Sequence, residues 1–213
     1  MIEKHIRLAW VLLLSSVSVA GASVEKPWEV SLAGGWSVAQ SEIFGFAHSQ
    51  TVFWSAVGYR VSPVVSFGME GGHFFGSDMD IPMTAPFHDT QHVSATHVGP
   101  YVQGELPVFK RFTLLGRFGT GATTVSTHGT ETNTVTGLDQ YFDFHQTNIS
   151  FTFMLGSRFW LAPNIALGFG LRDLLLFRYE TGVSNAGAPD PNLESTLHGR
   201  NVLVPFGEVA FRF

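Results

Sequence analysis

The chain contains no cysteine. This excludes disulfide frameworks, thiol-linked lipid anchors, cysteine-based metal sites and cysteine nucleophiles. Charge is also scarce: only 14% of the 213 residues are Asp, Glu, Lys or Arg, against about 25% in an average soluble domain. The formal net charge is -5, and the few cations form no basic run. This charge pattern argues against nucleic acid as a partner.

Beyond residue 22 the sequence has no uninterrupted apolar run long enough for a transmembrane helix. The first 22 residues, MIEKHIRLAWVLLLSSVSVAGA, have basic residues at Lys4 and Arg7, then a short apolar stretch and a small-x-small site at 20–22. These three parts are typical of a secretory signal peptide, and the apolar stretch is short for a membrane anchor. We therefore predict a cleaved Sec-type signal peptide at 1–22 and one mature domain at 23–213.

Most of the predicted mature chain alternates between apolar and polar or small residues. In NISFTFMLGSRFWL (148–161), Ile149, Phe151 and Phe153 lie on one face, and Asn148 and Ser150 lie on the other. A period of two is typical of strands with two different faces. The pattern predicts eight strands, at 28–40, 50–61, 64–75, 93–106, 112–125, 147–161, 164–178 and 201–213.

The predicted connections alternate strictly in length. Short ones lie at 62–63, 107–111 and 162–163, and long polar ones at 41–49, 76–92, 126–146 and 179–200. This asymmetry is typical of barrels in bacterial outer membranes. We therefore predict an all-β fold, an eight-stranded antiparallel transmembrane β-barrel with short periplasmic turns and four longer extracellular loops. A soluble barrel in the periplasm is the alternative, since alternation does not tell which face is wet.

The sequence ends in GEVAFRF, in which Val209, Phe211 and Phe213 share one face. A closed barrel pairs its last strand with its first, so we expect the last strand to run to the final residue. The segment resembles the C-terminal signal that the outer-membrane assembly machinery recognises in many barrels.

The whole sequence resembles small eight-stranded outer-membrane barrels of the OmpA or OmpW type. The stretch 148–178, with SRFWL and LRDLLLF, is similar to the outer membrane beta-barrel domain proteins of myxobacteria and their relatives. The resemblance implies a bacterial outer-membrane location, with membrane lipids, lipopolysaccharide and the assembly machinery as partners.

Charged residues collect on the inward parity of the predicted strands. They are Glu29, Arg60, Glu70, Glu105, Arg117, Arg158, Arg172, Glu208 and Arg212. Side chains can fill an eight-stranded barrel, and opposite charges inside it are expected to pair. We interpret this set as a salt-bridged filling of the lumen. The alternative is a narrow polar path or gate lined by the same residues. Asp173 departs from the pattern because strict alternation points it at lipid; a bulge or a position near a rim would reconcile it.

Aromatic residues near strand ends or on outward faces are expected to supply girdles at the two membrane interfaces. The candidates are Trp28, Trp36, Trp54, Tyr59, Tyr101, Trp160 and Tyr179.

Six histidines lie in or beside the predicted long loops. They are His88, His92, His97, His128, His145 and His198. Their spacing matches no compact metal motif. We therefore interpret them as solvated loop residues, and predict no metal site and no cofactor.

An enzymatic alternative is lipid A modification, which needs a nucleophile–base pair at the membrane-facing rim. Ser126 and His128 in VSTHGTE share a strand face, and Glu131 is close by. The stretch lacks the His-x-Ser-Asn arrangement of lipid A deacylase barrels, so we predict no catalytic residues. The leading prediction is a non-enzymatic structural or surface-interaction barrel, whose loops meet an unknown extracellular ligand. A narrow channel for small or amphipathic solutes is the second prediction.

Overall fold

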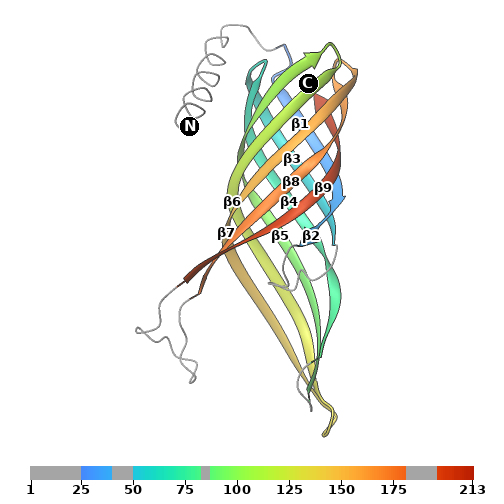
Figure 1. Cartoon of the computed structure of the whole chain (residues 1–213), viewed down its shortest axis with the longest axis vertical. Helices are drawn as coiled ribbons and strands as arrows, with labels where there is room; N and C mark the ends of the chain where they lie inside the picture. The colour runs from blue at the N-terminus through green and yellow to red at the C-terminus, as the bar shows by residue number, and fades with distance from the viewer. Residues whose placement is uncertain (1–24, 40–49, 83–86, 181–195) are drawn as a thin grey trace, which may run out of the picture.

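The computed structural model describes residues 25–39, 50–82, 87–180 and 196–213. They form one antiparallel sheet that closes on itself (Figure 1). The strands are β1 (Trp28–Trp36), β2 (Val38–Ala39), β3 (Thr51–Ser62), β4 (Val65–Pro82), β5 (Phe87–Phe109), β6 (Phe112–Asn133), β7 (Leu138–Ala162), β8 (Ile165–Glu180) and β9 (Thr196–Arg212). The predicted signal peptide at 1–22 lies outside the described residues.

The ring contains eight strands, as predicted. Neighbours pair in the order β1-β3-β4-β5-β6-β7-β8-β9, and β1 also pairs with β9. The short β2 follows β1 after Ser37 and pairs with β9 as well, so β1 and β2 occupy one position in the ring. Two backbone hydrogen bonds between Trp28 and Phe213, of 3.0 and 3.1 Å, complete the closure. No helix in the described part of the chain is long and apolar enough to cross a membrane.

The three predicted short turns are confirmed. β3 and β4, β5 and β6, and β7 and β8 are each joined by two residues. In the first turn, the Ser62 hydroxyl accepts the backbone N–H groups of Val64 and Val65, at 3.3 and 3.0 Å. These tight turns, the start of β1 and the end of β9 lie at one end of the barrel (Figure 1).

Two of the predicted long loops, 76–92 and 126–146, are wrong, because most of their residues continue the strands. β4 runs to Pro82, β5 begins at Phe87, and β6 and β7 extend to Asn133 and Leu138. Polar residues on both faces hide the alternation, while cross-strand pairs such as Thr132 with Asp139, at 2.8 Å, support the ladder. The β6–β7 turn occupies only 134–137, where Gly137 has a φ of 66°.

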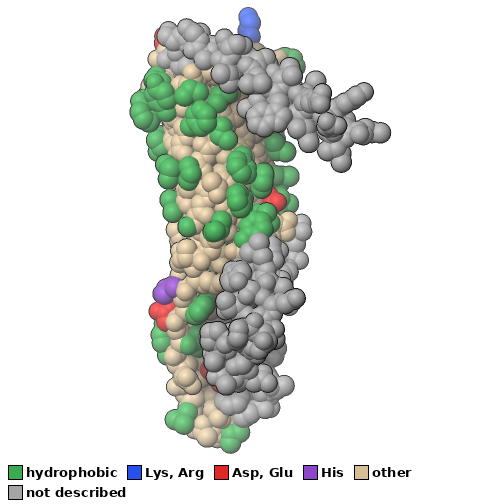
Figure 2. All heavy atoms as spheres, turned by 90° about the vertical axis from the view of Figure 1, so that its left-hand side faces the viewer, with side chains coloured by type: hydrophobic (Ala, Val, Ile, Leu, Met, Phe, Trp, Pro, Cys, Tyr) green, Lys and Arg blue, Asp and Glu red, His purple; other side chains and the backbone are tan. Residues whose placement is uncertain are grey.

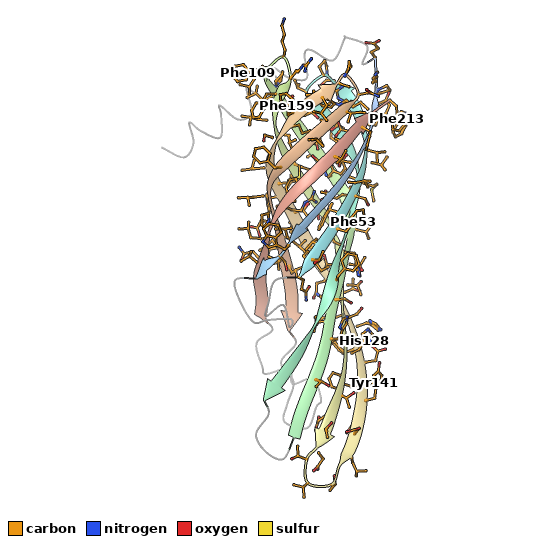
Figure 3. All side chains as sticks on the ribbon, turned by 90° about the vertical axis from the view of Figure 1, so that its right-hand side faces the viewer. Phe53, Phe109, His128, Tyr141, Phe159 and Phe213 are labelled. Atoms are coloured by element: carbon orange, nitrogen blue, oxygen red, sulfur yellow. The ribbon has the colours of Figure 1, made fainter. Side chains whose placement is uncertain are left out.

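Apolar side chains gather outside the barrel, next to the short turns (Figure 2). Trp28 and Tyr59 form an edge-to-face pair there, with ring centroids 5.1 Å apart. In Figure 3, Phe109, Phe159 and Phe213 lie at the turn end, Phe53 lies further along, and His128 and Tyr141 lie on the β6–β7 extension. The outer surface therefore has an apolar band at the turn end, while the extension at the other end mixes polar residues with exposed apolar ones such as Leu138 and Tyr141.

Three of the predicted girdle residues face the lumen instead. Trp54 and Tyr101 are only 3% and 4% exposed. Trp160 has the Arg212 guanidinium 3.9 Å from its ring centroid. The girdle prediction is wrong for these three because each shares its strand parity with buried residues. Trp28, Trp36 and Tyr59 are exposed, as expected, and the side chain of Tyr179 lies outside the described residues.

Asp173 lies on the outer parity of β8, opposite Phe153 of β7 and Leu203 of β9. The register is regular at this position, so the suggested bulge is absent. Apolar residues precede and follow it on the same face, at Leu171 and Leu175. Asp173 therefore interrupts the apolar band, with Asn201 as its side-chain hydrogen-bond partner.

Candidate functional site

Eight of the nine charged residues predicted for the lumen come together inside the barrel. We call them the Glu–Arg network: Glu29 (β1), Glu70 (β4), Glu105 (β5), Arg117 (β6), Arg158 (β7), Arg172 (β8), Glu208 and Arg212 (β9). Seven of them are buried, and Arg212 is partly buried. Because the strands alternate faces, each contributes its charge at an inward position. The network contains four acidic and four basic side chains, so its formal charges balance.

Arg158 is the centre of the network and is 1% exposed. Its Nε and Nη2 atoms each lie 2.9 Å from an oxygen of Glu208, a bidentate pair. Its Nη1 atom lies 2.7 Å from Glu29 and 3.3 Å from Glu105. One guanidinium thereby contacts carboxylates from three strands. Such charge-assisted bonds offset the cost of burying the ions.

Glu70 organises the part of the network farther from the short turns. Its Oε2 atom lies 2.9 Å from Arg172 and 3.3 Å from Arg117. Trp54 Nε1 donates to the same oxygen at 3.3 Å, and the Thr152 hydroxyl donates to Oε1 at 2.5 Å. Both carboxylate oxygens therefore have donors.

Gln103 connects the two halves of the network. Its amide oxygen accepts from Arg117 Nε and Nη2 at 2.9 and 2.6 Å. Its amide nitrogen donates to Glu105 at 3.0 Å and to Glu29 at 3.3 Å. Gln103 is fully buried. Its inward parity was visible in the sequence, but an uncharged amide carries no signal that it joins charges.

The network is closed at its turn end by Arg212 and Glu105. Arg212 Nη2 lies 2.5 Å from Glu105, and Arg212 Nε lies 2.9 Å from Glu29. Arg60, the ninth predicted member, lies beside the turn end of the network without joining it. Its guanidinium donates to the Pro63 carbonyl at 2.6 Å, at the β3–β4 turn. Among the described residues, Arg60 has no ion pair within 4 Å.

Beyond the network, away from the short turns, the lumen is filled by apolar side chains. We call the following set the apolar layer: Trp54, Phe74, Val93, Ala95, Val125, Leu174, Leu176, Val202, Val204 and Phe206. On β8 and β9, Leu174 follows Arg172 and Phe206 precedes Glu208 at successive inward positions. These residues have the same inward parity as the charges, so the layer could have been predicted from the sequence, although only the charges were.

His97 lies at the boundary between the network and the apolar layer. It is 1% exposed and stacks on Trp54, with ring centroids 5.2 Å apart. Its Nδ1 atom lies 3.0 Å from the hydroxyls of both Thr123 and Ser150. The interpretation of His97 as a solvated loop residue is therefore wrong, because β5 begins ten residues earlier, at Phe87, and carries it into the lumen.

The outer face of the β6–β7 extension carries a second polar cluster. His145 Nδ1 lies 2.9 Å from the Ser126 hydroxyl, and His145 Nε2 lies 3.3 Å from Asp143. His128 Nδ1 lies 2.9 Å from the same Asp143 oxygen. The base facing Ser126 is thus His145 on the neighbouring strand rather than His128. Glu131 has the opposite strand parity and points to the other face. Within the described residues, no group of three His, Asp or Glu side chains is arranged to hold a metal ion.

Known structures share this architecture at low sequence identity. A major outer membrane protein from Thermus thermophilus aligns with a TM-score of 0.53 and 11% identity, over 87% of this chain and 99% of that one. Ail, the attachment invasion locus protein of Yersinia pestis, aligns at 0.44 and 12%, over 89% and 100%. The outer membrane protease OmpT from Escherichia coli aligns at 0.44 and 8%, over 91% and 100%. A search of curated protein sequences finds no match.

A family model for the outer membrane protein beta-barrel domain matches residues 9–199. This match spans most of the chain and agrees with the closed ring of eight antiparallel strands. The chain therefore belongs to the outer membrane protein beta-barrel domain family and is a bacterial outer-membrane barrel.

Proposed function

We propose that this chain is a closed, non-enzymatic barrel with a structural or surface-interaction role at the outer membrane. The observation that carries the proposal is the pairing of Arg158 with Glu29, Glu105 and Glu208 across the lumen. A conducting path needs water between these groups, and their direct contacts leave none between guanidinium and carboxylate. The apolar layer is a second barrier, because water in an apolar constriction lacks hydrogen-bond partners.

The outer surface supports contacts with lipid, lipopolysaccharide and the assembly machinery. The apolar band faces outward beside the short turns, which in outer-membrane barrels lie on the periplasmic side. Val209, Phe211 and Phe213 lie on the outer parity of β9, and Phe213 is 63% exposed. Their outward direction supports the proposal that this segment is the C-terminal assembly signal. The β6–β7 extension then projects outward, beyond the apolar band, and offers the surface for an extracellular ligand.

Conductance of the refolded barrel in a planar bilayer tests the closed lumen. The native chain is expected to produce no discrete steps. Reproducible unitary steps from the native chain would replace this proposal with the narrow channel for small or amphipathic solutes. A heat-treated, unfolded sample serves as the control, since steps seen there come from contaminants or bilayer defects.

A second candidate function is ester hydrolysis at the outer rim, and the Ser126–His145–Asp143 chain of contacts favours it. Ser126 Oγ would attack an acyl ester carbonyl and pass its proton to His145, which protonates the leaving alcohol oxygen. Water would then cleave the acyl-serine with His145 again accepting a proton. Against this, His145 and Asp143 have side chains 57% and 45% exposed, and solvent weakens their coupling.

Mass spectrometry of lipid A from cells that express the native chain or Ser126→Ala separates the two candidates. Identical lipid A from both supports the non-enzymatic proposal. Loss of an acyl chain with the native protein alone would establish the hydrolase. Ser94→Ala is the matched control, because Ser94 lies opposite Ser126 in the β5–β6 register.

A further inference from the structure

The wall of the barrel splits between β7 and β8 on the extracellular side. Their pairing begins near the turn at Ala162 and Ile165 and ends at Ile149 and Phe177. β7 continues for eleven more residues, 138–148, and over this length it pairs only with β6 among the described strands. Figures 1 and 3 both show the far ends of β8 and β9 diverging from the β6–β7 extension. We call the side of 138–148 that faces away from β6 the open edge.

The open edge presents a regular row of backbone groups. The register between β6 and β7 runs from Phe112 and Phe159 to Asn133 and Leu138 without a shift, so no bulge disturbs it. In an antiparallel pair every second residue directs its N–H and C=O away from the partner, which leaves about five residues with both groups on the open edge. These groups can pair with another extended chain.

The sequence of the open edge, LDQYFDFHQTN, lacks several of the features that protect edges in other sheets, and its only Asp or Glu side chains are Asp139 and Asp143. It has no Pro, Lys, Arg or Gly, and natural proteins use Lys, Pro and bulges to discourage pairing at an edge. Large side chains along it are exposed: Leu138 is 70% exposed, Tyr141 69% and Phe144 55%. An edge of this length, flat and rich in aromatic residues, favours the addition of a strand.

The charge of the same region indicates what kind of strand fits. Residues 123–147 contain Glu131, Asp139 and Asp143 and no Lys or Arg. His128 and His145 contact Asp143, so Asp139 is the carboxylate of the open edge that has no histidine partner among the described residues. Asp139 and Asp143 share the outer face of the open-edge strand, while Leu138, Phe142 and Phe144 share the other face. A strand added here meets carboxylates on one face and apolar side chains on the other.

We infer that the open edge of β7 is a docking site for an extended cationic segment of a partner protein, which adds to the sheet as a strand. Its basic side chains would face Asp139 and Asp143, and its alternate apolar side chains would cover Phe142 and Phe144. Backbone pairing supplies the affinity. The carboxylates on one face and the apolar side chains on the other supply the specificity. This inference rests on the proposed surface-interaction role and names the class of partner.

A synthetic peptide of alternating lysine and valine, about as long as the open edge, tests the inference on the full chain in lipid vesicles. The peptide is expected to bind and to slow hydrogen exchange of those amides in 138–148 that point away from β6. The same peptide with methylated backbone nitrogens, and a glutamate–valine peptide, are expected to bind at least about tenfold more weakly because they lose the backbone pairing or the charge match. Equal binding by all three peptides would overturn the inference.

Two charge reversals on the same hairpin locate the site. Asp139→Lys is expected to weaken peptide binding about fivefold, because an attractive cross-strand pair becomes repulsive. Glu131→Lys makes the same charge change on β6, away from the open edge, and is expected to change binding less than about twofold. Equal losses would show a general electrostatic attraction and contradict docking at the edge.

Hydrogen exchange measured before any peptide is added tells whether something else already covers the open edge. The amides to follow are those of every second residue in 138–148, which point away from β6. Slow exchange of these outward amides in a monomeric native chain would mean that residues of this chain already cover the edge. Slow exchange together with a doubled particle mass in sedimentation would mean that a second copy covers it. Either result overturns the partner-strand inference. A conducting lumen with peptide binding intact would instead refute only the closed barrel.

Discussion

The Nη1 atom of Arg158 lies 2.7 Å from Oε1 of Glu29, although 129 positions separate the two residues in the chain. Arg158 is on β7 and Glu29 is on β1, and these strands are not neighbours in the ring. The contact crosses the lumen and exists only when the barrel has closed. It therefore couples the first strand of the ring to a distant part of the wall.

Removal of the Arg158 guanidinium is expected to destabilise the barrel strongly. Arg158→Ala leaves Glu208 without its bidentate partner and takes one partner from Glu29 and Glu105. Glu208 then keeps only the more distant Arg117 as a cationic partner among the described residues, at 3.8 Å. Removing the main partner of a buried carboxylate costs about 3–5 kcal/mol in the free energy of unfolding. Urea unfolding in lipid vesicles, followed by tryptophan fluorescence, measures the cost.

Arg60→Ala is the control for this measurement. Arg60 donates to one carbonyl at the β3–β4 turn, near solvent, so its loss is expected to cost less than about 1 kcal/mol. Similar costs for the two variants would show that the network adds no more stability than a surface contact.

The inward charges could be predicted from the sequence because strand parity decides which face each residue takes. The partners could not, since they depend on the stagger between strands far apart in the chain. Arg60 shows the limit: it has the parity of the lumen, yet the β3–β4 turn follows it at once. Strand parity tells whether a side chain points toward the lumen. Its position along the barrel axis depends on where the strand begins and ends.

For Trp54, strand parity indicated an inward side chain, but its aromatic type favoured the girdle interpretation. It shares its parity with Val52 and Ala56, both buried, while its aromatic type is typical of interface girdles. The extended β6 and β7 were missed for a different reason. Polar residues on both of their faces remove the alternation, and pairing with the adjacent strand stabilises them instead.

Gly72 is expected to be required because its lack of a side chain leaves room for the Trp54 ring. The two residues are directly opposite across β3 and β4, and a Cβ on Gly72 would meet the Trp54 ring. Because that ring is held between His97 and Arg172, it cannot move aside, and Gly72→Ala is expected to cost about 1–3 kcal/mol. Thermal unfolding by circular dichroism reports it.

Gly104→Ala is the matched substitution for Gly72→Ala, since nothing lies within 4 Å of a Cβ at position 104. It is expected to change stability by less than about 0.5 kcal/mol. A loss as large as that of Gly72→Ala would mean that strand flexibility, and not room for the indole, is what glycine supplies.

Asp173 is expected to be a destabilising residue of the outer face. One of its carboxylate oxygens is buried without a hydrogen-bond partner in the described part of the chain, and apolar residues flank it on β8. Asp173→Leu is therefore expected to stabilise the barrel by about 1–2 kcal/mol in vesicles. A loss of stability in vesicles would show that the hydrogen bond to Asn201 contributes more than the cost of exposing the carboxylate to lipid.

The two barriers in the lumen are expected to act in series. Glu70→Ala with Arg158→Ala removes the centres of both halves of the Glu–Arg network, yet Trp54 and Phe74 still fill the lumen beyond it. This double variant should therefore remain closed in a planar bilayer. Adding Trp54→Ala and Phe74→Ala takes away two of the three aromatic side chains of the apolar layer and leaves Phe206, and that quadruple variant should conduct. Heat-modified electrophoretic mobility confirms that each variant has folded. Conductance already in the double variant would mean that the charges alone close the barrel, because water would then pass the apolar layer unaided.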